Sequence, residues 1–414
     1  MTDLFVFGLT MLLKITALWF LVTALLFWKR PPVYPRRNPR TRFACLIPAR
    51  NEEAVIGELV GCLKAQDYPP ELFDVYVVPN NCTDDTAGAA LRAGAKVLTC
   101  DQPVRYKGGA LRQSLGKLMN EGYDAFCVFD ADNLVKPDYL SHMNDAFCAG
   151  ARLAKARLTT RNTFDSWVAG CYTLYFAIFD RFFNRSRAQM GLSAKLVGTG
   201  FAVRRDVLVT MGGWMTESIA EDAEFAAMCA EMGERVWWVP EAVTYDEAPT
   251  GFRLSLIQRR RWCSGIMSAA TLRLRPLVQS FRQGGGTEVT LRRVDSLMFL
   301  CSPFFQALSL IPMVLLMGRA AVNGTILTWL VVFGASLGAS ALGLMGFGTL
   351  LAAWIGIRDR RIVKSILGFP LFMACWMPLM LLSLLHRTTE WKAIAHRGAR
   401  AGVTNGNGAV SALK

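Results

Sequence analysis

Histidine is scarce in this chain, with three residues among 414, and so few imidazoles exclude a histidine-based metal cluster. Cysteine is more frequent, but the eleven residues form no Cys-x-x-Cys pair, which argues against a zinc site or a disulfide framework and fits a reducing cytosol. No internal repeat or low-complexity segment occurs apart from three consecutive glycines at 284–286. These absences argue against zinc-bound, disulfide-rich and repeat architectures.

Apolar runs, by contrast, are long and unevenly placed. They cover residues 4–28, 297–317, 326–357 and 366–385, and each is long enough to cross a bilayer as a helix, which takes about 20 residues. Between the first two runs lies a stretch of roughly 250 residues with ordinary soluble composition, enough for a full globular domain. The sequence therefore predicts a multi-pass membrane protein with one large aqueous domain.

The charges beside the first run predict its orientation. No positive charge precedes this run and no cleavage pattern follows it, so we expect residues 1–28 to be a membrane span and not a removed signal peptide. The linker 29–42 holds six Lys and Arg residues, which predicts an N-terminus outside and a cytoplasmic catalytic domain at the inner (plasma) membrane of a bacterial-type cell. Lys14 within the span either faces another helix or extends toward the membrane surface.

The C-terminal part, 295–386, is expected to cross the membrane about three times before a short tail at 387–414. Basic residues occur both in the loop before residues 366–385 and in the tail. Both cannot lie inside if 366–385 makes a simple crossing. A re-entrant segment is one resolution, and Pro370 and Pro378 make the last stretch the candidate for it.

Basic residues gather beside the apolar spans, and the net charge is +14. Residues 251–294 alone contain nine arginines interleaved with Leu, Ile, Phe and Trp, a pattern typical of amphipathic helices that lie on the inner leaflet. Anionic membrane lipids and phosphorylated substrates are therefore the expected partners. Nucleic acid is not expected, because the charge flanks membrane spans.

Short apolar runs alternate with amphipathic stretches between residues 43 and 250. We expect strands at 43–47, 74–78, 96–98 and 125–129. We expect helices between them at 51–65, at 83–93 with Thr83 as its cap, and at 109–119. This alternation predicts an α/β domain with a mostly parallel sheet, in which ligands bind beyond the carboxyl ends of the strands. Three polar clusters fall at such ends, at 48–53, 80–85 and 130–133.

The third of these clusters places two carboxylates directly after a strand. Asp130 and Asp132 are expected to point to the same side, because strand neighbours two apart share a face. Carboxylate oxygens suit Mg²⁺ or Mn²⁺, which take one or two carboxylates together with substrate phosphates. A plain surface turn is the alternative for this short pattern by itself.

Two glycine-containing motifs extend the candidate site. Lys107-Gly108 opens a predicted helix, where a cation and free amide groups could bind a phosphate. Gly198-Thr199-Gly200 would let the backbone approach a ligand closely. An ordinary helix start and a tight turn are the respective alternatives.

Two further polar motifs follow. Glu221-Asp222 begins a predicted helix, where a carboxylate could act as a general base or could simply interact with the helix dipole. Gln258, Arg261 and Trp262 lie just before the membrane part. There Arg could bind a diphosphate and Trp could stack on a sugar, and an interfacial Arg/Trp belt is the alternative.

Seven short motifs thus follow one another along the chain: Pro-x-x-Asn-Glu, Asn-Cys-Thr-Asp-Asp-Thr, Lys-Gly, Asp-Ala-Asp, Gly-Thr-Gly, Glu-Asp and Gln-x-x-Arg-Trp. This series resembles the membrane-integrated family-2 glycosyltransferases of the GT-A fold. That group contains the cellulose, chitin and hyaluronan synthases and bacterial exopolysaccharide transferases. The resemblance covers about residues 43–270, and its last motif is the most specific.

The resemblance implies a Rossmann-like GT-A domain and a role for each matching residue. Donor binding would fall to Ala49, Arg50, Glu52, Asn80, Lys107 and Asp130. Asp132, together with Asp130, would hold Mg²⁺ or Mn²⁺, and Asp222 would deprotonate the acceptor. The acceptor and the diphosphate would be contacted by Gly198, Thr199, Gly200, Glu221, Gln258, Arg261 and Trp262.

The resemblance further implies inverting transfer of a sugar from a nucleotide-diphosphate donor, expected to be a UDP-sugar. Asn80 departs from the aspartate of many relatives, which makes the uracil preference less specific, and Ala220 replaces their threonine. We expect a saccharide acceptor in extracellular polysaccharide synthesis, with export partner proteins. A lipid acceptor is the alternative, and a transporter or scaffold with a nucleotide-binding domain is a remote one.

Overall fold

The computed structural model describes residues 2–387 of the chain, with side chains from residue 6. An eight-stranded sheet has the order β3-β2-β1-β4-β7-β6-β8-β5. Its strands are β1 (Phe43–Ala49), β2 (Phe73–Pro79), β3 (Lys96–Val97), β4 (Ala125–Val128), β5 (Leu134–Val135), β6 (Leu153–Thr160), β7 (Phe201–Arg204) and β8 (Val236–Asp246). Four neighbouring pairs are parallel and three are antiparallel. The predicted α/β fold is therefore confirmed.

Helices cover both faces of this sheet because its strands are apolar on both sides. Phe43, Cys45 and Ile47 of β1 pack with α2 (Ile56–Lys64), α3 (Thr86–Arg92) and α5 (Tyr139–Cys148). The alternate residues Ala44 and Leu46 pack with α4 (Lys107–Leu118), α8 (Arg205–Met211) and α9 (Glu221–Glu231). Successive side chains of a strand point to opposite faces of the sheet, so both sets are buried when helices lie on both faces.

Two helices begin later than the sequence pattern predicts. The expected helix 51–65 begins only at Ile56, because Asn51 adopts a left-handed conformation with a φ of 58°. The expected cap Thr83 is also wrong: Asp85 caps α3 by accepting the Gly88 amide. The residues before each helix form loops instead. The Asn51 side chain joins the two loops by accepting the Thr83 amide at 2.7 Å. Both loops border the edge of the sheet where β1 and β2 end.

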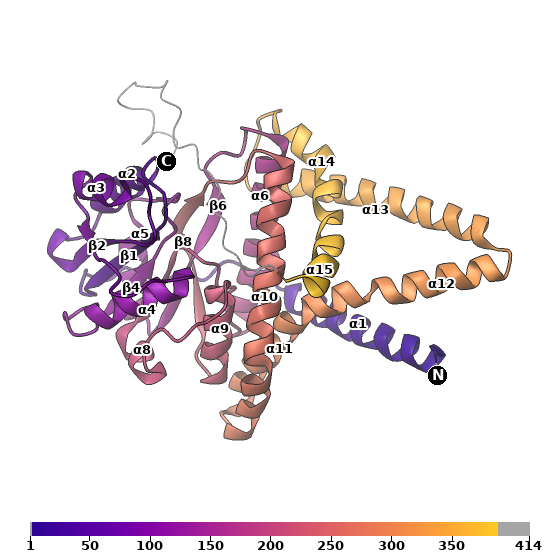
Figure 1. Cartoon of the computed structure of the whole chain (residues 1–414), viewed down its shortest axis with the longest axis horizontal. Coiled ribbons are helices and arrows are strands. Elements are labelled where there is room, and N and C mark those ends of the chain that lie inside the picture. Colours follow the sequence, from indigo (N-terminus) through magenta and orange to yellow (C-terminus); the bar gives the residue numbers. More distant parts are fainter. Residues whose placement is uncertain (1, 388–414) are drawn as a thin grey trace.

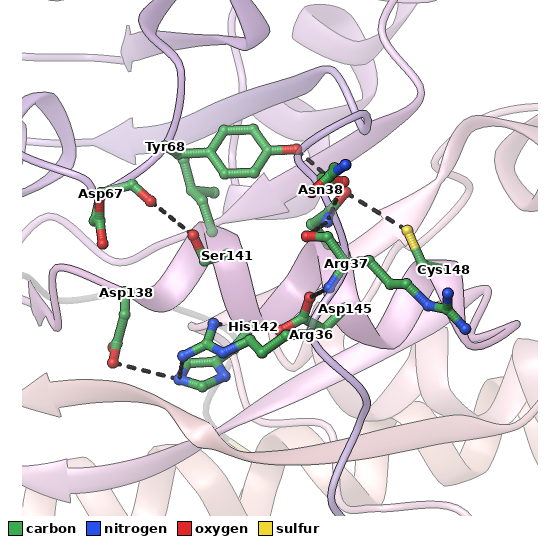
Figure 2. Close-up of polar contacts among 12 residues, drawn as sticks. Arg36, Arg37, Asn38, Asp67, Tyr68, Asp138, Ser141, His142, Asp145 and Cys148 are labelled. Carbon is green, nitrogen blue, oxygen red and sulfur yellow. Dashed lines mark hydrogen bonds and ion pairs between the residues drawn. The ribbon is translucent and has the colours of Figure 1, made fainter.

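The basic linker 29–42 is held against helix α5. Asp145 accepts the Arg37 amide at 2.8 Å and pairs with the Arg36 guanidinium at 3.3 Å (Figure 2). Asn144, buried beside it, accepts the Arg40 and Thr41 amides, both at 3.2 Å. The linker is therefore a fixed connection between the first apolar helix and the sheet.

Four helices of the described chain are long and apolar enough to cross a membrane: 6–24, 286–322, 326–354 and 362–385. They belong to α1 (Thr2–Ala24), α11 (Gly286–Leu308) with α12 (Leu310–Val322), α13 (Ile326–Trp354), and α14 (Ile362–Ala374) with α15 (Trp376–Leu385). Figure 1 shows α1, α12 and α13 extending away from the sheet. These positions agree with one N-terminal and three C-terminal spans. Lys14 is exposed on α1, so it does not face another described helix.

The last span is interrupted at Cys375, between α14 and α15. Pro378 has no N–H to donate to the carbonyl four residues earlier, and this missing bond accounts for the break. Pro370 lies inside α14. The re-entrant segment stays a prediction, and the tail beyond Arg387 lies outside the described residues.

Residues 251–294 were expected to form amphipathic helices on the inner leaflet, and in the structure they include one long helix with many buried residues. Helix α10 (Phe252–Ser280) lies between the sheet domain and the apolar helices (Figure 1). Arg259 is buried on it and donates to the Phe372 carbonyl of α14 at 2.5 Å, with its guanidinium over the Phe372 ring. The expected boundary after residue 294 falls within α11. Helix α10 thus connects the two parts of the molecule.

The Asn144 side chain provides a test of the linker attachment. Asn144→Ala should lower the stability of the protein by about 1–3 kcal/mol, because the Arg40 amide and the buried Thr41 amide lose their acceptor. Thermal unfolding of the detergent-purified protein measures the effect. Asn38→Ala, at an exposed position of the same linker, serves as the control. Equal melting temperatures for the two variants would contradict a fixed linker.

Candidate active site

The predicted site residues gather at one edge of the sheet. Strands β1, β2 and β4 end at this edge, and β7, antiparallel to β4, begins there. A cavity of about 210 Å³, here called the polar crevice, is lined by these strand ends, the start of α9 and helix α10. Fourteen of the fifteen predicted residues line it: Ala49, Arg50, Glu52, Asn80, Lys107, Asp130, Asp132, Gly198, Thr199, Glu221, Asp222, Gln258, Arg261 and Trp262.

Gly200 is the exception, and its expected acceptor contact stays a prediction. It does not line the polar crevice. Its φ is +63°, and a Cβ at this position would lie 2.7 Å from the Thr244 side chain. Backbone conformation and close packing therefore both require glycine at this position.

Three carboxylates come together on one side of the crevice. Burial and the charge of Asp130 raise the pKa of Asp132 to about 7. Burial and the charges of Asp132 and Asp130 raise the pKa of Glu52 to about 8. Such mutual destabilisation of anions is relieved by a cation.

A divalent metal fits this arrangement in part. Within residues 2–387, no group of three or more His, Cys, Asp or Glu side chains is placed to hold a metal ion. Asp130 and Asp132 would supply two oxygen ligands, and the phosphates of a bound nucleotide would supply others, as is usual for Mg²⁺. The site is therefore one that a metal and a diphosphate would complete together.

Lys107 connects three separate stretches of the chain. Its ammonium donates to Asp130 at 2.6 Å and to the Gly198 carbonyl, and it pairs with Glu221 at 3.3 Å. Burial alone would lower the pKa of Lys107, but the charges of Asp130 and Glu221 raise it overall. It therefore stays charged and holds two acids and a loop at fixed positions.

A hydrogen-bonded chain behind Asp130 fixes the Gly198–Gly200 turn. The Thr199 hydroxyl accepts the Asp130 amide at 3.1 Å and donates to Asn133, whose amide group donates to Asp246 at 3.0 Å. Thr199 thus lines the crevice while it positions the strand end that carries Asp130.

Glu221 and Asp222 occupy the first turn of α9, where the helix dipole favours acids. Burial is the main reason that the pKa of Asp222 is raised, and the charges of Lys107 and Lys195 oppose it. Burial likewise raises the pKa of Glu221 to about 7, against the charge of Lys107. A carboxylate with a raised pKa is a stronger base. Asp222 faces the crevice together with Asp130 and Asp132.

Two amide side chains have oxygens available to a ligand. Asn80 donates its amide group to the Ala49 carbonyl at 3.3 Å, which leaves its oxygen to accept. The Gln258 Oε1 atom is buried and has no hydrogen-bond partner among the described residues. Buried acceptors of this kind usually have a partner, so an N–H or O–H group of a ligand is expected there.

A second, mostly apolar cavity of about 840 Å³ adjoins the polar crevice. It extends from β6 and α9 to the membrane-type helices α11 to α15, and we call it the apolar cavity. Six residues line both spaces: Leu158, Phe176, Val197, Ala220, Asp222 and Trp262. Asp222 and Trp262 therefore lie at the junction. The Trp262 ring is stacked with Trp376 of α15 at 6.2 Å between centroids.

Sequence comparison assigns the chain to a protein family. The model described as "Glycosyltransferase like family 2" matches residues 39–265, more than half of the chain and all the strands. The chain belongs to glycosyltransferase family 2.

Several known glycosyltransferases are similar to it. The probable glycosyltransferase YdaM of Bacillus subtilis is 28% identical over 54% of this chain and 55% of its own. The β-monoglucosyldiacylglycerol synthase of Nostoc is 30% identical over 64% of this chain and 56% of its own. The chain thus spans little more than half the length of these relatives.

A solved structure of the same fold also matches. It is the mannosyltransferase PcManGT from Pyrobaculum calidifontis in complex with GDP-Man and Mn²⁺. Its TM-score is 0.61 at 17% identity, over 89% of this chain and 99% of that one. This likeness establishes the GT-A fold of the transferase.

The sequence motifs do not reveal every residue of the site. Asp246 lines the polar crevice at the end of β8, and Arg105 and Tyr106 line it before α4. An apolar run that ends in Tyr245-Asp246-Glu247 is the available signal for Asp246. The apolar cavity has no comparable signal, because its walls come from elements far apart in the chain.

A substitution at Gly200 tests the role of the Gly198–Gly200 turn in this transferase. Gly200→Ala should destabilise the fold by about 1–3 kcal/mol, because alanine is strained at positive φ and meets Thr244. It should also lower activity by displacing Thr199. Thermal unfolding and turnover measure the two effects.

The matched control is Gly116→Ala, on α4 with open space at the Cβ position. Alanine there should be neutral or stabilising by about 0.5–1 kcal/mol. The backbone role of Gly200 is refuted if both variants unfold at the same temperature.

Proposed function

We propose that this family-2 glycosyltransferase transfers a sugar, with inversion, from a nucleotide-diphosphate donor to a hydroxyl group of a membrane lipid. The observation that carries the proposal is the place of Asp222, at the junction of the polar crevice and the apolar cavity. A base at this point can reach an acceptor that enters from the membrane side.

The donor would bind in the polar crevice. Asn80 offers an acceptor oxygen to the N–H of a base such as uracil, which supports a UDP-sugar. Arg261 would contact the diphosphate, since guanidinium groups bind phosphate oxygens in pairs, and the Gln258 amide nitrogen would donate to it. A bound Mg²⁺ or Mn²⁺ would neutralise the charge of the leaving nucleoside diphosphate.

The chemistry would be a single displacement. Asp222 takes the proton of the acceptor hydroxyl as its oxygen bonds to the anomeric carbon, and the bond to the diphosphate breaks on the opposite face. Lys107, fixed by Asp130 and Glu221, adds positive charge near the leaving group. Attack from the opposite face inverts the anomeric configuration, so no covalent sugar–protein intermediate is needed.

The lipid acceptor is supported by the walls of the apolar cavity. Its volume of about 840 Å³ lies within the range of small-molecule sites. Phe333, Leu337 and Leu344 of α13 line it, and α13 is one of the helices able to cross a membrane. Water would fill such a cavity poorly, whereas acyl chains would suit it. The name of the Nostoc relative also describes glucose on a diacylglycerol.

A saccharide acceptor is the second candidate, and it was the expectation from sequence. Trp262 at the junction supports it, because an indole ring beside the base can stack on a sugar. The predicted export partners belong to this candidate alone. Product analysis separates the two: radiolabel in chloroform-soluble glycolipid supports the lipid acceptor, and a long water-soluble polymer supports the saccharide.

We further propose that the protein resides in the inner (plasma) membrane, with its N-terminus outside and its catalytic domain in the cytoplasm. The four long apolar helices and the basic linker 29–42 support this arrangement. A cytoplasmic site has direct access to nucleotide sugars.

The role of Asp222 can be tested by removing its charge. Asp222→Asn should lower kcat by about 100-fold or more, since a positioned base contributes about 10²–10⁴. Donor binding should change little, because the crevice keeps its shape. In the wild type, the rate should rise with pH as Asp222, whose pKa is raised, loses its proton. The rise should be smaller in the variant, where only other crevice acids such as Asp132 and Glu221 still titrate. Steady-state kinetics and nucleotide-binding calorimetry measure both.

Glu217→Gln, an exposed acid in the loop before α9, is the control and should keep wild-type rates. Near-normal turnover of Asp222→Asn would mean that another group accepts the proton.

The apolar cavity can be tested by filling it. Ala341→Trp on α13 should raise the KM for a lipid acceptor about tenfold or more, because the indole occupies space that the acyl chains would need. Hydrolysis of the donor in the absence of acceptor should not change. Transfer of radiolabelled sugar in nanodiscs measures both activities.

The control is Ala339→Trp, two residues away on the same helix and exposed. It does not line the cavity. If both variants change the KM equally, or neither does, the acceptor does not occupy this cavity.

A further inference from the structure

The apolar cavity has a polar end, and two lysines lie there. Lys155 comes from β6 and Lys195 from the loop between α7 (Ser186–Gln189) and β7. Both line the cavity together with Asp222. The opposite walls, from α12 to α15, contribute apolar side chains such as Met313, Phe333 and Met377. The cavity is therefore amphipathic, with its charged end beside the proposed base.

Neither lysine forms an ion pair with the described part of the chain. Lys155 is 1% exposed, and its hydrogen bond to the Gly200 carbonyl is long, at 3.5 Å. The Lys195 ammonium lies 3.9 Å from the centre of the Phe179 ring and 5.0 Å from that of Phe299. Buried ammonium groups are normally paired, because desolvation is costly.

Asp180 interacts electrostatically with Lys155, but other polar and charged groups also interact with its carboxylate. Its carboxylate accepts from the Asn184 amide group at 3.5 Å, and the Asn184 oxygen accepts the Lys195 amide at 2.9 Å. Arg157 and Arg185, as well as Lys155, act electrostatically on Asp180. One carboxylate thus faces several cations at this end of the cavity.

Desolvation also affects the pKa values of the two lysines. Desolvation lowers the pKa of each to about 8. The charge of Asp180 opposes this shift at Lys155, and the charge of Asp222 opposes it at both lysines. At neutral pH both remain mostly protonated. A bound anion would stabilise the charged form.

We propose that Lys155 and Lys195 bind a phosphate group of the acceptor lipid, which makes the preferred acceptor an anionic phospholipid with a free hydroxyl. This inference rests on the proposed function, because it assumes a lipid in the apolar cavity. The phosphate would lie between the lysines, the acyl chains would extend toward α12 to α15, and the hydroxyl would face Asp222. The lysines are positioning residues in this scheme and take no proton from the acceptor.

The experiment uses the full-length protein in phosphatidylcholine nanodiscs with Mn²⁺ and radiolabelled UDP-sugar or GDP-mannose. Two pure lipids serve as acceptors: dioleoylphosphatidylglycerol, which has a phosphate and free hydroxyls, and dioleoylglycerol, which is neutral. Total membrane lipids of the expression host, separated by anion exchange into neutral and anionic fractions, widen the choice. We expect label in the anionic lipids, with at least a tenfold preference in kcat/KM.

The variants Lys155→Met and Lys195→Met should raise the KM for the anionic acceptor at least tenfold and leave kcat within about threefold. Lys155→Arg and Lys195→Arg should restore most of the affinity, and Lys64→Met, at an exposed position on α2, should have no effect. Without lipid, both methionine variants should melt at or above the wild-type temperature, because each removes a charge that has no ion-pair partner in the described structure. Lysines with a merely structural role would instead lower it.

The outcomes distinguish this inference from the function on which it rests. Transfer to neutral lipids only, with an unchanged KM in the methionine variants, overturns the phosphate site and leaves the lipid transferase intact. Label found only in a water-soluble saccharide, or in no lipid fraction, overturns both. Methionine variants that unfold early while the arginine variants also fail to restore affinity overturn the assignment of the lysines.

Discussion

The site depends on how one ammonium group balances acids that come from distant parts of the chain. Lys107 contacts Asp130 after β4, Glu221 at the start of α9 and the carbonyl of Gly198 before β7. Without this cation, two acids would repel each other in a partly buried space. Lys107 thus allows several carboxylates to share one crevice. In the same crevice, burial and the neighbouring acids raise the pKa values of Asp132 and Glu52.

A second constraint is the connection between the sheet domain and the apolar helices. Helix α10 carries Gln258, Arg261 and Trp262 on the side of the crevice, and its buried Arg259 bonds to the backbone of α14. The same helix therefore contributes side chains to the walls of both the polar crevice and the apolar cavity. In this family-2 glycosyltransferase, the polar crevice and the apolar cavity thus meet at one carboxylate, Asp222.

Much of the fold follows from local patterns. The strands β1, β2 and β4 were expected within two residues of their ends, because apolar runs bounded by polar clusters are strong local signals. The helix starts at 51 and 83 were wrong, because loop conformation depends on contacts such as that of Asn51 with Thr83. The motif residues of the crevice, except Gly200, were found from sequence. The roles assigned to them remain predictions.

The sequence by itself determined the α/β class, the four apolar spans and the types of chemical group available, since these depend on composition and short-range periodicity. Only the tertiary structure decided which groups meet. It placed Asp222 beside both the polar crevice and a large apolar cavity, and it placed Lys155 and Lys195 at the charged end of that cavity. The physical reason is that a cavity is enclosed by side chains from many separate elements. Their packing is a non-local property that no single stretch of sequence records.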